Sequence, residues 1–329
     1  MYTETSISRP TILQREPQFF LQQFGISGAD SQLGWRTHPD AIVLYVDSGH
    51  GNANDSNWGT DPLHPKATVQ SAVDSTLLTP YSEIRISGTV SESVVTPDSS
   101  DGPNYVWIRG QGVSRYSPTW TSDLETTIAL DMRATGWKVS GFRFLGNTTA
   151  ANIAIRYADT NANDVAIKTV IQECYFDGQI VGLTAIESHG AFDVWILNNT
   201  FSLWNNAGNT SCCLRAVDDG LAIPLRNYVI GNVFDNSDNG VIFPCNGSYF
   251  TDNVFQPVGV TYTMVQALQT SVGGTPGDDN VVTRNHFGGT YSVAGGYTAG
   301  AADDWVGNIA MDVASPQVAD NGYTVLRPV

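Results

Sequence analysis

The sequence predicts an all-β chain wound as a solenoid of short strands. Three observations predict this class: few charged residues, short strand-like segments at regular spacing, and a repeated motif built on Asn and Phe. Of the 329 residues, 41% are hydrophobic, 15% are charged and 32 are glycine. Coiled coils and helical bundles need many more charged helix formers, so the composition favours β-structure around a sizeable core.

The chain is acidic, with 32 Asp and Glu against 16 Lys and Arg, which gives a net charge of −16. Nucleic acids and anionic membranes attract clustered basic residues, and no basic run occurs here. We therefore expect neither a nucleic-acid partner nor a membrane partner. The first 24 residues lack the pattern of a cleaved secretory signal, so we expect no signal peptide.

The N-terminal part divides into an arm and a capped start of the solenoid. Residues 1–40 carry three prolines and no clear period, which favours an extended arm that anchors the chain. A strand is expected at 41–47, followed by a polar loop at 48–65. A capping helix is expected over 65–78, because Pro65 suits a first helical turn and an apolar stripe follows. The stripe consists of Val69, Ala72, Val73 and Leu77.

Short strands then continue to residue 312, and residues 313–329 form a C-terminal tail. Three early segments of alternating apolar residues begin at Ile84, Val106 and Ile128, which are 22 residues apart. Alternation of this kind is typical of strands. The spacing therefore predicts one coil for about every 22 residues, with loops of variable length between strands.

A second pattern runs from residue 139: an apolar residue, two spacers, Asn, any residue and Phe. Its copies are VSGFRF at 139–144, IQECYF at 171–176, ILNNTF at 196–201, VIGNVF at 229–234, FTDNVF at 250–255, VTRNHF at 282–287 and WVGNIA at 305–310. Phe142 and Cys174 fill the Asn slot in the first two copies. Asparagine fills it in the other five, at Asn199, Asn232, Asn253, Asn285 and Asn308.

This repeat predicts stacked coils that share one core, because a single coil cannot bury its own apolar face. Equivalent residues would then lie one above another at the strand spacing of about 4.8 Å. A column of asparagines would bond amide to amide, and a column of phenylalanines would stack inside. We therefore interpret the asparagines as structural and not as ligand-binding residues.

The four cysteines show no metal-binding CxxC spacing. Cys212 and Cys213 are adjacent in the sequence, so in a strand they would point to opposite faces. Buried thiols are expected, with a single disulfide as the alternative.

The segment YVDSGHGNANDSNWGTDPLHPKATVQSAVD at 45–74 and the Asn-x-Phe coils at 139–310 resemble the right-handed parallel β-helix proteins of the pectate-lyase-like superfamily. The resemblance spans about 45–312 and implies a right-handed single-stranded parallel β-helix, with the early helix as its cap. It is specific for fold and does not specify a function, because this fold carries lyases, hydrolases, epimerases, adhesins and viral spikes. The late WVGN strand at 305–308 also looks like strands in tailed-phage structural modules.

Hydrolases and lyases of the superfamily imply one candidate cluster. Hydrolases use close aspartates, for which Asp218 and Asp219 are candidates, but His189 precedes them whereas the family histidine follows. No Arg-Ile-Lys motif follows either. Lyases use a basic residue, for which Arg215 and Arg226 are candidates. With Glu187, the cluster for an enzyme reads Asp218, Asp219, Arg215, Glu187 and His189; the alternative for the aspartate pair is a solvated turn.

Two further sites are conceivable. The early loop is rich in oxygen ligands that could hold calcium, namely Asp47, Asn52, Asn54, Asp55, Asn57 and Asp61. Its alternative is a loop tied by Asx turns. Trp195 adjoins an inward Ile196 and is the candidate for stacking on a sugar ring, with packing as the alternative; Trp204, Tyr249 and Trp305 lie in similar segments.

On function, we expect a non-enzymatic virion component of a phage or virus: a spike, a fibre or a capsid-surface decoration. It would attach to other virion proteins through residues 1–40, form a homotrimer by analogy with viral β-helices, and reach the virion surface by assembly in the host cytoplasm. It could also contact a host surface glycan. The alternative is an extracellular polysaccharide lyase or glycoside hydrolase. No cofactor is expected beyond the conceivable calcium ion.

Overall fold

The fold is described from a computed structural model. The described residues are 41–112, 118–122, 128–146, 152–157, 166–179, 183–204, 211–217, 224–235, 237–256, 266–270, 277–287, 297–298, 302–310 and 324–325. The expected arm at 1–40 lies outside these residues, and so does most of the tail at 313–329.

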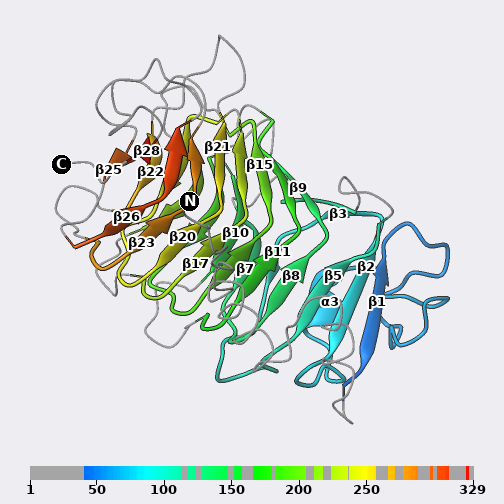
Figure 1. The fold of residues 1–329 in the computed structure, drawn as a ribbon. Coiled ribbons are helices and arrows are strands. Elements are labelled where there is room, and N and C mark those ends of the chain that lie inside the picture. The colour runs from blue at the N-terminus through cyan, green and yellow to red at the C-terminus, as the bar shows by residue number, and fades with distance from the viewer. Residues whose placement is uncertain are drawn as a thin grey trace, which may run out of the picture.

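Three long sheets run side by side along the molecule, and from β2 to β25 each coil contributes one strand to each sheet in turn (Figure 1). Sheet A has the order β1-β2-β5-β8-β11-β14-β17-β20-β23-β26, sheet B runs from β3 to β28, and sheet C runs from β4 to β25. Every pairing is parallel except the last, β27 with β28. Neighbours in a sheet lie one coil apart in the sequence, which defines a parallel β-helix.

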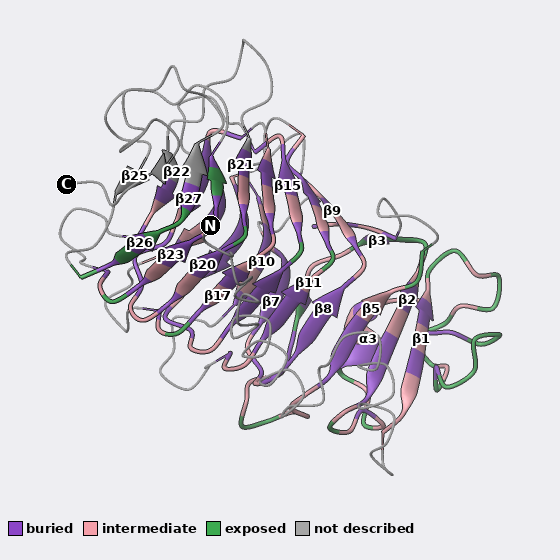
Figure 2. Ribbon diagram, viewed as in Figure 1, coloured by how far each residue is buried: buried purple, intermediate pink, exposed green. Residues whose placement is uncertain are grey.

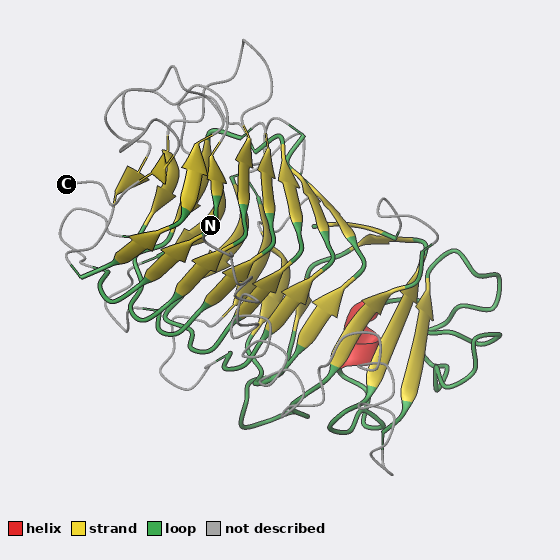
Figure 3. Ribbon diagram, viewed as in Figure 1, coloured by secondary structure: helices red, strands yellow, loops and turns green. Residues whose placement is uncertain are grey.

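The strands are short and nearly all of the regular structure is strand (Figure 3). Sheet A comprises β1 Val43–Asp47, β2 Glu83–Ser87, β5 Trp107–Gly110, β8 Lys138–Ser140, β11 Val170–Gln172, β14 Trp195–Leu197, β17 Tyr228–Ile230, β20 Tyr249–Thr251, β23 Val281–Thr283 and β26 Asp304–Val306. Sheet B comprises β3 Thr89–Ser91, β6 Thr119–Thr121, β9 Arg143–Leu145, β12 Tyr175–Asp177, β15 Thr200–Ser202, β18 Val233–Asp235, β21 Val254–Gln256, β24 His286–Phe287, β27 Asn308–Ala310 and β28 Thr324–Val325. Sheet C comprises β4 Val94–Val95, β7 Ile128–Met132, β10 Ile153–Tyr157, β13 Thr184–Ser188, β16 Cys212–Ala216, β19 Asn239–Ile242, β22 Gln266–Gln269 and β25 Tyr297–Thr298.

The repeated motif forms the corner between sheets A and B. Its first residue points into the core from sheet A, and its sixth residue points into the core from sheet B. Its third residue has a positive φ and turns the chain between the two sheets. Gly141 and Gly231 take this left-handed conformation without a Cβ penalty, at φ values of 77° and 68°. The other described copies use Glu173, Asn198, Asp252, Arg284 and Gly307 at the same place.

The interior is one continuous apolar core along the whole stack (Figure 2). Five successive ring pairs of the phenylalanine column lie 4.8 to 5.1 Å apart between centroids and are nearly parallel. This distance is the strand spacing, so the ring stacking follows directly from the parallel register. The stacked residues are Phe144, Phe176, Phe201, Phe234, Phe255 and Phe287.

The N-terminal helix is shorter than the residues expected for it. Helix α3 spans only Val69–Val73, with Thr68 as its N-cap, whereas 65–78 was expected. Lys66 cannot join the helix because its backbone pairs with β1, through Lys66 N–H to the Tyr45 carbonyl at 2.9 Å. Val69, Ala72 and Val73 are buried and pack into the hydrophobic core.

The early 22-residue spacing also needs correction. Ile84 lies in β2 and Val106 directly precedes β5, both in sheet A, but Ile128 begins β7 in sheet C. The next sheet A strand along the chain is β8. The register pairs Ile84 with Ile108, because the coils differ in loop length. A spacing alone cannot distinguish which of three sheets a short strand joins.

Candidate functional site

The asparagine column is a ladder of buried amides. In each described step, the side-chain oxygen of one asparagine accepts from both the backbone N–H and the side-chain NH₂ of the asparagine one coil earlier. Asn253 Oδ1 accepts from Asn232 N at 2.9 Å and from Asn232 Nδ2 at 3.1 Å. Asn253 Nδ2 then donates to Asn285 Oδ1 at 3.0 Å and to the Val229 carbonyl at 2.8 Å. From Asn199 to Asn285, the amides bond to one another and to backbone carbonyls.

A second buried ladder lies at the opposite end of the sheet A strands, and the sequence analysis missed it. Asn227 N donates to Ser248 Oγ, Ser248 N to Asn280 Oδ1, and Asn280 N to Asp303 Oδ1, at distances of 2.9 to 3.0 Å. Each of these residues stands two places before the apolar residue that opens a motif copy. A polar residue at this fixed offset was the signal in the sequence.

The outer face of sheet C carries a column of alternating charge. The register places Asp131, Arg156, Glu187 and Arg215 on successive strands. Arg156 bonds Asp131 with two nitrogens, at 3.1 and 2.7 Å. Glu187 Oε1 lies 2.8 Å from His189 Nε2. Three residues of the predicted cluster, Glu187, His189 and Arg215, therefore lie together on this face.

The other two members of that cluster, Asp218 and Asp219, lie outside the described residues. Asp131 and Glu187 are two strands apart, about 9.6 Å from the strand spacing, with Arg156 on the strand between them. Both carboxylates are almost buried, at 3% and 7% exposure. The Asp131 carboxylate accepts from Arg156 on the next coil, whereas the Glu187 carboxylate contacts His189 of its own coil.

The outer face of sheet A carries a separate apolar and aromatic cluster. Trp195 lies on the face opposite the inward Ile196, as alternation predicts, but it is only 4% exposed and stacks on Tyr228 at 5.3 Å. Tyr228 stacks in turn on Tyr249 at 5.3 Å. Trp204 and Trp305 belong to the interior core. Trp195 therefore packs within a stack, and its ring is not presented as an open platform.

Lys138 is the unexpected member of this outer face. It is fully buried on β8, and its Nζ lies 4.1 Å from the centre of the Trp107 ring. Burial lowers the pKa of this ammonium group to about 8, because the charged form loses its hydration. No hydrogen-bond partner of Nζ occurs among the described residues. The sequence signal was a lysine at a strand position whose coil neighbours are apolar.

The early loop uses its oxygen ligands to hold itself together. Asp55 Oδ1 accepts from Ala67 N, Thr68 N and Ser71 Oγ at 2.7 to 3.0 Å, and these hydrogen bonds outweigh burial to lower the pKa of Asp55. Asp47 and Asp61 each accept the backbone N–H two residues on. Asn54 and Asn57 likewise bond within the loop. In the described ranges, no group of three or more His, Cys, Asp or Glu is placed to hold a metal ion.

All four cysteines are free thiols and buried. Cys213 belongs to the core and Cys212 lies on the opposite face of β16, also fully buried. Burial raises the pKa of Cys174 and of Cys212 to about 12. Such thiols are poor nucleophiles. The four free thiols confirm the expectation of buried cysteines, and the disulfide alternative is wrong.

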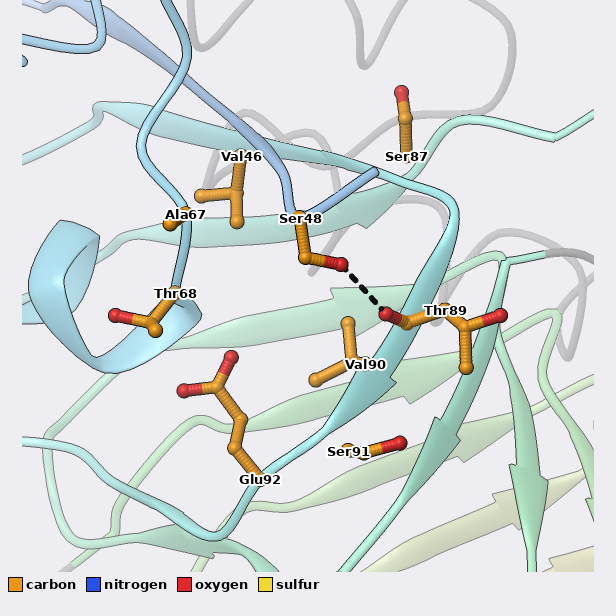
Figure 4. Close-up of a pocket in the computed structure, with 9 residues that line it drawn as sticks. All are labelled: Val46, Ser48, Ala67, Thr68, Ser87, Thr89, Val90, Ser91 and Glu92. Carbon is orange, nitrogen blue, oxygen red and sulfur yellow. Dashed lines mark hydrogen bonds between the residues drawn. The ribbon is translucent and has the colours of Figure 1, made fainter. Parts of the chain in front are cut away.

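One pocket lies at the N-terminal end of the stack, beside α3 and β3 (Figure 4). It has a volume of about 310 Å³ and an apolar floor that includes Val46 and Val90. Hydroxyl groups and Glu92 surround this floor. Glu92 accepts from Val69 N at 2.7 Å and Gln70 N at 3.2 Å, so its carboxylate holds the first turn of α3. Across the pocket, Ser48 Oγ donates to the Thr89 carbonyl at 3.0 Å.

The sequence matches no family profile and no curated protein. Solved structures similar to it include the GH136 lacto-N-biosidase of Eubacterium ramulus, at 11% identity over 79% of this chain and 59% of that one, with a TM-score of 0.46. A rice weevil pectin methyl esterase shares 10% identity over 80% and 84% of the two chains, with a TM-score of 0.41. The Dettilon tailspike protein shares 11% over 91% and 74%, with a TM-score of 0.24. The chain spans less than two thirds of the lacto-N-biosidase.

These similarities concern the fold, and they cover hydrolases as well as a phage tailspike. In the described part of the chain, no helix has the length and apolar character needed to cross a membrane. The three parallel sheets, the corner motif and the stacked columns agree with the resemblance found in the sequence. The chain is a parallel β-helix protein.

Proposed function

We propose that the chain is a structural component of a phage or virus particle: a spike, a fibre or a capsid-surface decoration. The observation that supports this proposal is the use of polar and charged columns to join coil to coil. The buried amide ladder, the charge column of sheet C and the pair Arg143–Asp177 at 2.6 Å all bridge successive coils. A shaft that carries mechanical load needs such bonds along its whole length.

The surface pairs at the corners add to this support. Arg226 bonds Asp193 with two nitrogens at 2.8 and 3.1 Å, and Arg284 bonds Asp252 at 2.7 and 2.6 Å. Each pair joins one coil to the next. The net charge of −16 suits a surface that faces solvent better than one that faces packaged nucleic acid.

In this proposal, residues 1–40 attach the chain to another virion protein and the β-helix projects outward as a homotrimer. The projecting face would be free to meet a host surface glycan. The chain would be made in the host cytoplasm and reach the virion surface by assembly.

Particles from the source of the sequence test the proposal. An antibody raised against the purified chain should label the outside of purified particles in electron microscopy. A chain that lacks residues 1–40 should fold yet fail to join particles. If the chain is absent from purified particles and occurs only as free protein, the proposal is wrong.

A second candidate function is cleavage of polysaccharides, by a lyase or a glycoside hydrolase. It is favoured by one observation: Glu187, His189 and Arg215 come together on sheet C, and β16 ends two residues before Asp218. The purified chain would be incubated with acidic and neutral polysaccharides, with and without calcium, and new reducing ends and unsaturated products would be measured.

If cleavage occurs, changing both Asp218 and Asp219 to Ala should abolish it. The matched control is the same change at the other Asp pair, Asp278 and Asp279, which should leave cleavage intact. Equal activity in both double variants would remove the Glu187 cluster as the site, and cleavage in the parent would displace the structural proposal.

A further inference from the structure

The early loop, residues 48–65, places its two largest apolar side chains in solvent. Trp58 is 71% exposed and Leu63 is 64% exposed. Among the described residues, the other large apolar side chains that are exposed are Val95 on β4 and Val306 on β26, which lie in different strands. Single exposed apolar residues are ordinary on protein surfaces, but an exposed apolar pair on one loop favours an interaction surface.

The backbone on both sides of Trp58 is fixed. On one side, Asn57 Nδ2 donates to the Asn52 carbonyl at 2.8 Å. On the other side, the carbonyl of the buried Gly59 accepts from Tyr45 N on β1 at 2.7 Å. The loop therefore cannot fold the indole ring back onto the body of the protein without breaking these hydrogen bonds.

Leu63 is anchored in the same way. Its N–H donates to Asp61 Oδ1 at 2.9 Å, and its carbonyl accepts from Asn52 Nδ2 at 3.2 Å. Asn52 thus bonds to both anchored stretches, through its carbonyl beside Trp58 and through its side chain at Leu63. One ordered loop displays both apolar side chains, which lowers the conformational entropy that binding would cost.

The polar side chains of the loop are directed at backbone groups of the chain itself. Four of them bond within the loop or to the N-cap of α3: Asn52, Asn54, Asp55 and Asn57. Side chains engaged in this way leave fewer groups to orient the hydroxyls of a sugar, and Leu63 has no flat face on which a sugar ring could stack. Trp58 and Leu63 together therefore fit an apolar protein surface better than a glycan.

The charge of the loop describes the partner further. Asp55 and Asp61 are its charged residues at neutral pH, and Asp55 Oδ1 is bonded to Thr68 N at 2.8 Å. The Asp61 side chain is 52% exposed, with one oxygen 3.1 Å from His64 Nδ1. The hydrogen bond from Leu63 N lowers the pKa of Asp61, so this carboxylate is ionised at neutral pH. A basic group on the partner would face it at the edge of the apolar contact.

The early loop lies at the N-terminal end of the solenoid, where the blue segment after β1 projects from the stack (Figure 1). The described chain begins at Ala41, just before β1, and the proposed function attaches the chain to the particle at this end. We propose that the early loop is a docking surface for the virion protein to which the chain attaches, with Trp58 and Leu63 as its anchors. That protein would offer an apolar pocket to the indole ring and a basic group to Asp61. The inference rests on the proposed function, from which it takes the partner.

Particles assembled with variant chains test the docking surface. The parent, Trp58→Ala, Leu63→Ala or the control Val306→Ala would be supplied as the sole copy of the chain, at a level that leaves its sites on the particle partly filled. Copies of the chain per purified particle would be counted by quantitative mass spectrometry. We expect Trp58→Ala to lower this number at least about tenfold and Leu63→Ala to lower it less. Val306 is also exposed but lies at the other end of the stack, so Val306→Ala should match the parent.

The outcomes separate the docking surface from the proposed function. If the parent is absent from particles, the proposed function is wrong and the docking surface is wrong with it. If the parent is present and Trp58→Ala is equally abundant, the docking surface is wrong and the proposed function stands. Normal incorporation of Trp58→Ala combined with poor binding of the particles to host cells would assign the loop to the host surface and would also overturn the inference. Urea unfolding should give equal midpoints for the parent and Trp58→Ala, because an exposed side chain contributes little to stability.

Oxidative footprinting gives a second measurement that needs no variant. Hydroxyl radicals oxidise exposed indole rings, and mass spectrometry measures the oxidation at each residue. Trp58 should be oxidised readily in the free chain and should lose most of this oxidation in the particle, whereas His286, exposed on β24, should not change. Equal oxidation of Trp58 in both states would overturn the inference even if every variant misfolded. Protection of Trp58 in the free chain would assign the loop to a second copy of the chain, and this too would overturn it.

Discussion

Asn253→Ala tests whether the amide ladder stabilises the solenoid. The Asn253 side chain makes four hydrogen bonds, two accepted from Asn232 and two donated to Asn285 and to the Val229 carbonyl. Asn253 is fully buried. Four bonds with a net contribution of about 1 kcal/mol each give a loss of about 4 kcal/mol.

The assay is urea unfolding followed by circular dichroism, combined with native-state hydrogen exchange. Exchange should increase most in the coils that contain Asn232 and Asn285, because each coil contacts only its neighbours. Asn54→Ala, in the exposed early loop, is the matched control and should cost much less. A loss of stability below about 1 kcal/mol for Asn253→Ala would refute the reasoning. The ladder would then only replace the hydrogen bonds that these groups make with water in the unfolded chain, without a net gain in stability.

Three further predictions follow from the same columns. Cys174→Asn should extend the ladder by one step towards Phe142, because Asn199 Oδ1 already accepts from Cys174 N at 2.9 Å; a gain of about 1 kcal/mol should appear in urea unfolding, and a loss would show that position 174 cannot hold an amide. Phe234→Ala should cost about 3 to 5 kcal/mol in the same assay, since its ring stacks on both coil neighbours, and a cost below this range would mean that the column collapses to fill the space. Lys138→Met should stabilise the fold at pH 7 by up to about 3 kcal/mol, because burial lowers the folded-state pKa to about 8. The folded chain loses this proton before the unfolded chain does, so the advantage of Met should shrink as the pH rises from 8 towards the ordinary lysine pKa; an advantage independent of pH would contradict it.

The corner motif could be read directly because it repeats in sequence and obeys a local rule. An apolar residue, a left-handed turn residue, an Asn and a Phe recur together whatever the loop lengths between them. The amide ladder, the phenylalanine stack and the parallel β-helix follow from that repetition. Each coil packs against equivalent residues of the coils before and after it, so the local sequence pattern also specifies the global fold.

Assignments that depended on loop length were less accurate. Ile128 lies in sheet C and not in sheet A, because the loops before it differ in length from those of the preceding coil. Lys66 pairs with β1 and does not begin the helix. The sequence predicted part of the Glu187 cluster, since His189 and Arg215 lie next to Glu187. Arg156, from the preceding coil, lies on the same face and was not predicted. No linear motif includes that arginine.

The sequence by itself determined the solenoid, the corner between sheets A and B and the two columns that fill it, since these depend on contacts between equivalent positions. Only the tertiary structure decided what happens on the outer faces and at the ends. Trp195 and Lys138 point away from the core yet are buried, and a pocket lies beside β3. The exposure of a side chain and the pairing of a sheet edge depend on contacts between segments that are distant in the sequence. A repeat that specifies only contacts between neighbouring coils does not specify those contacts.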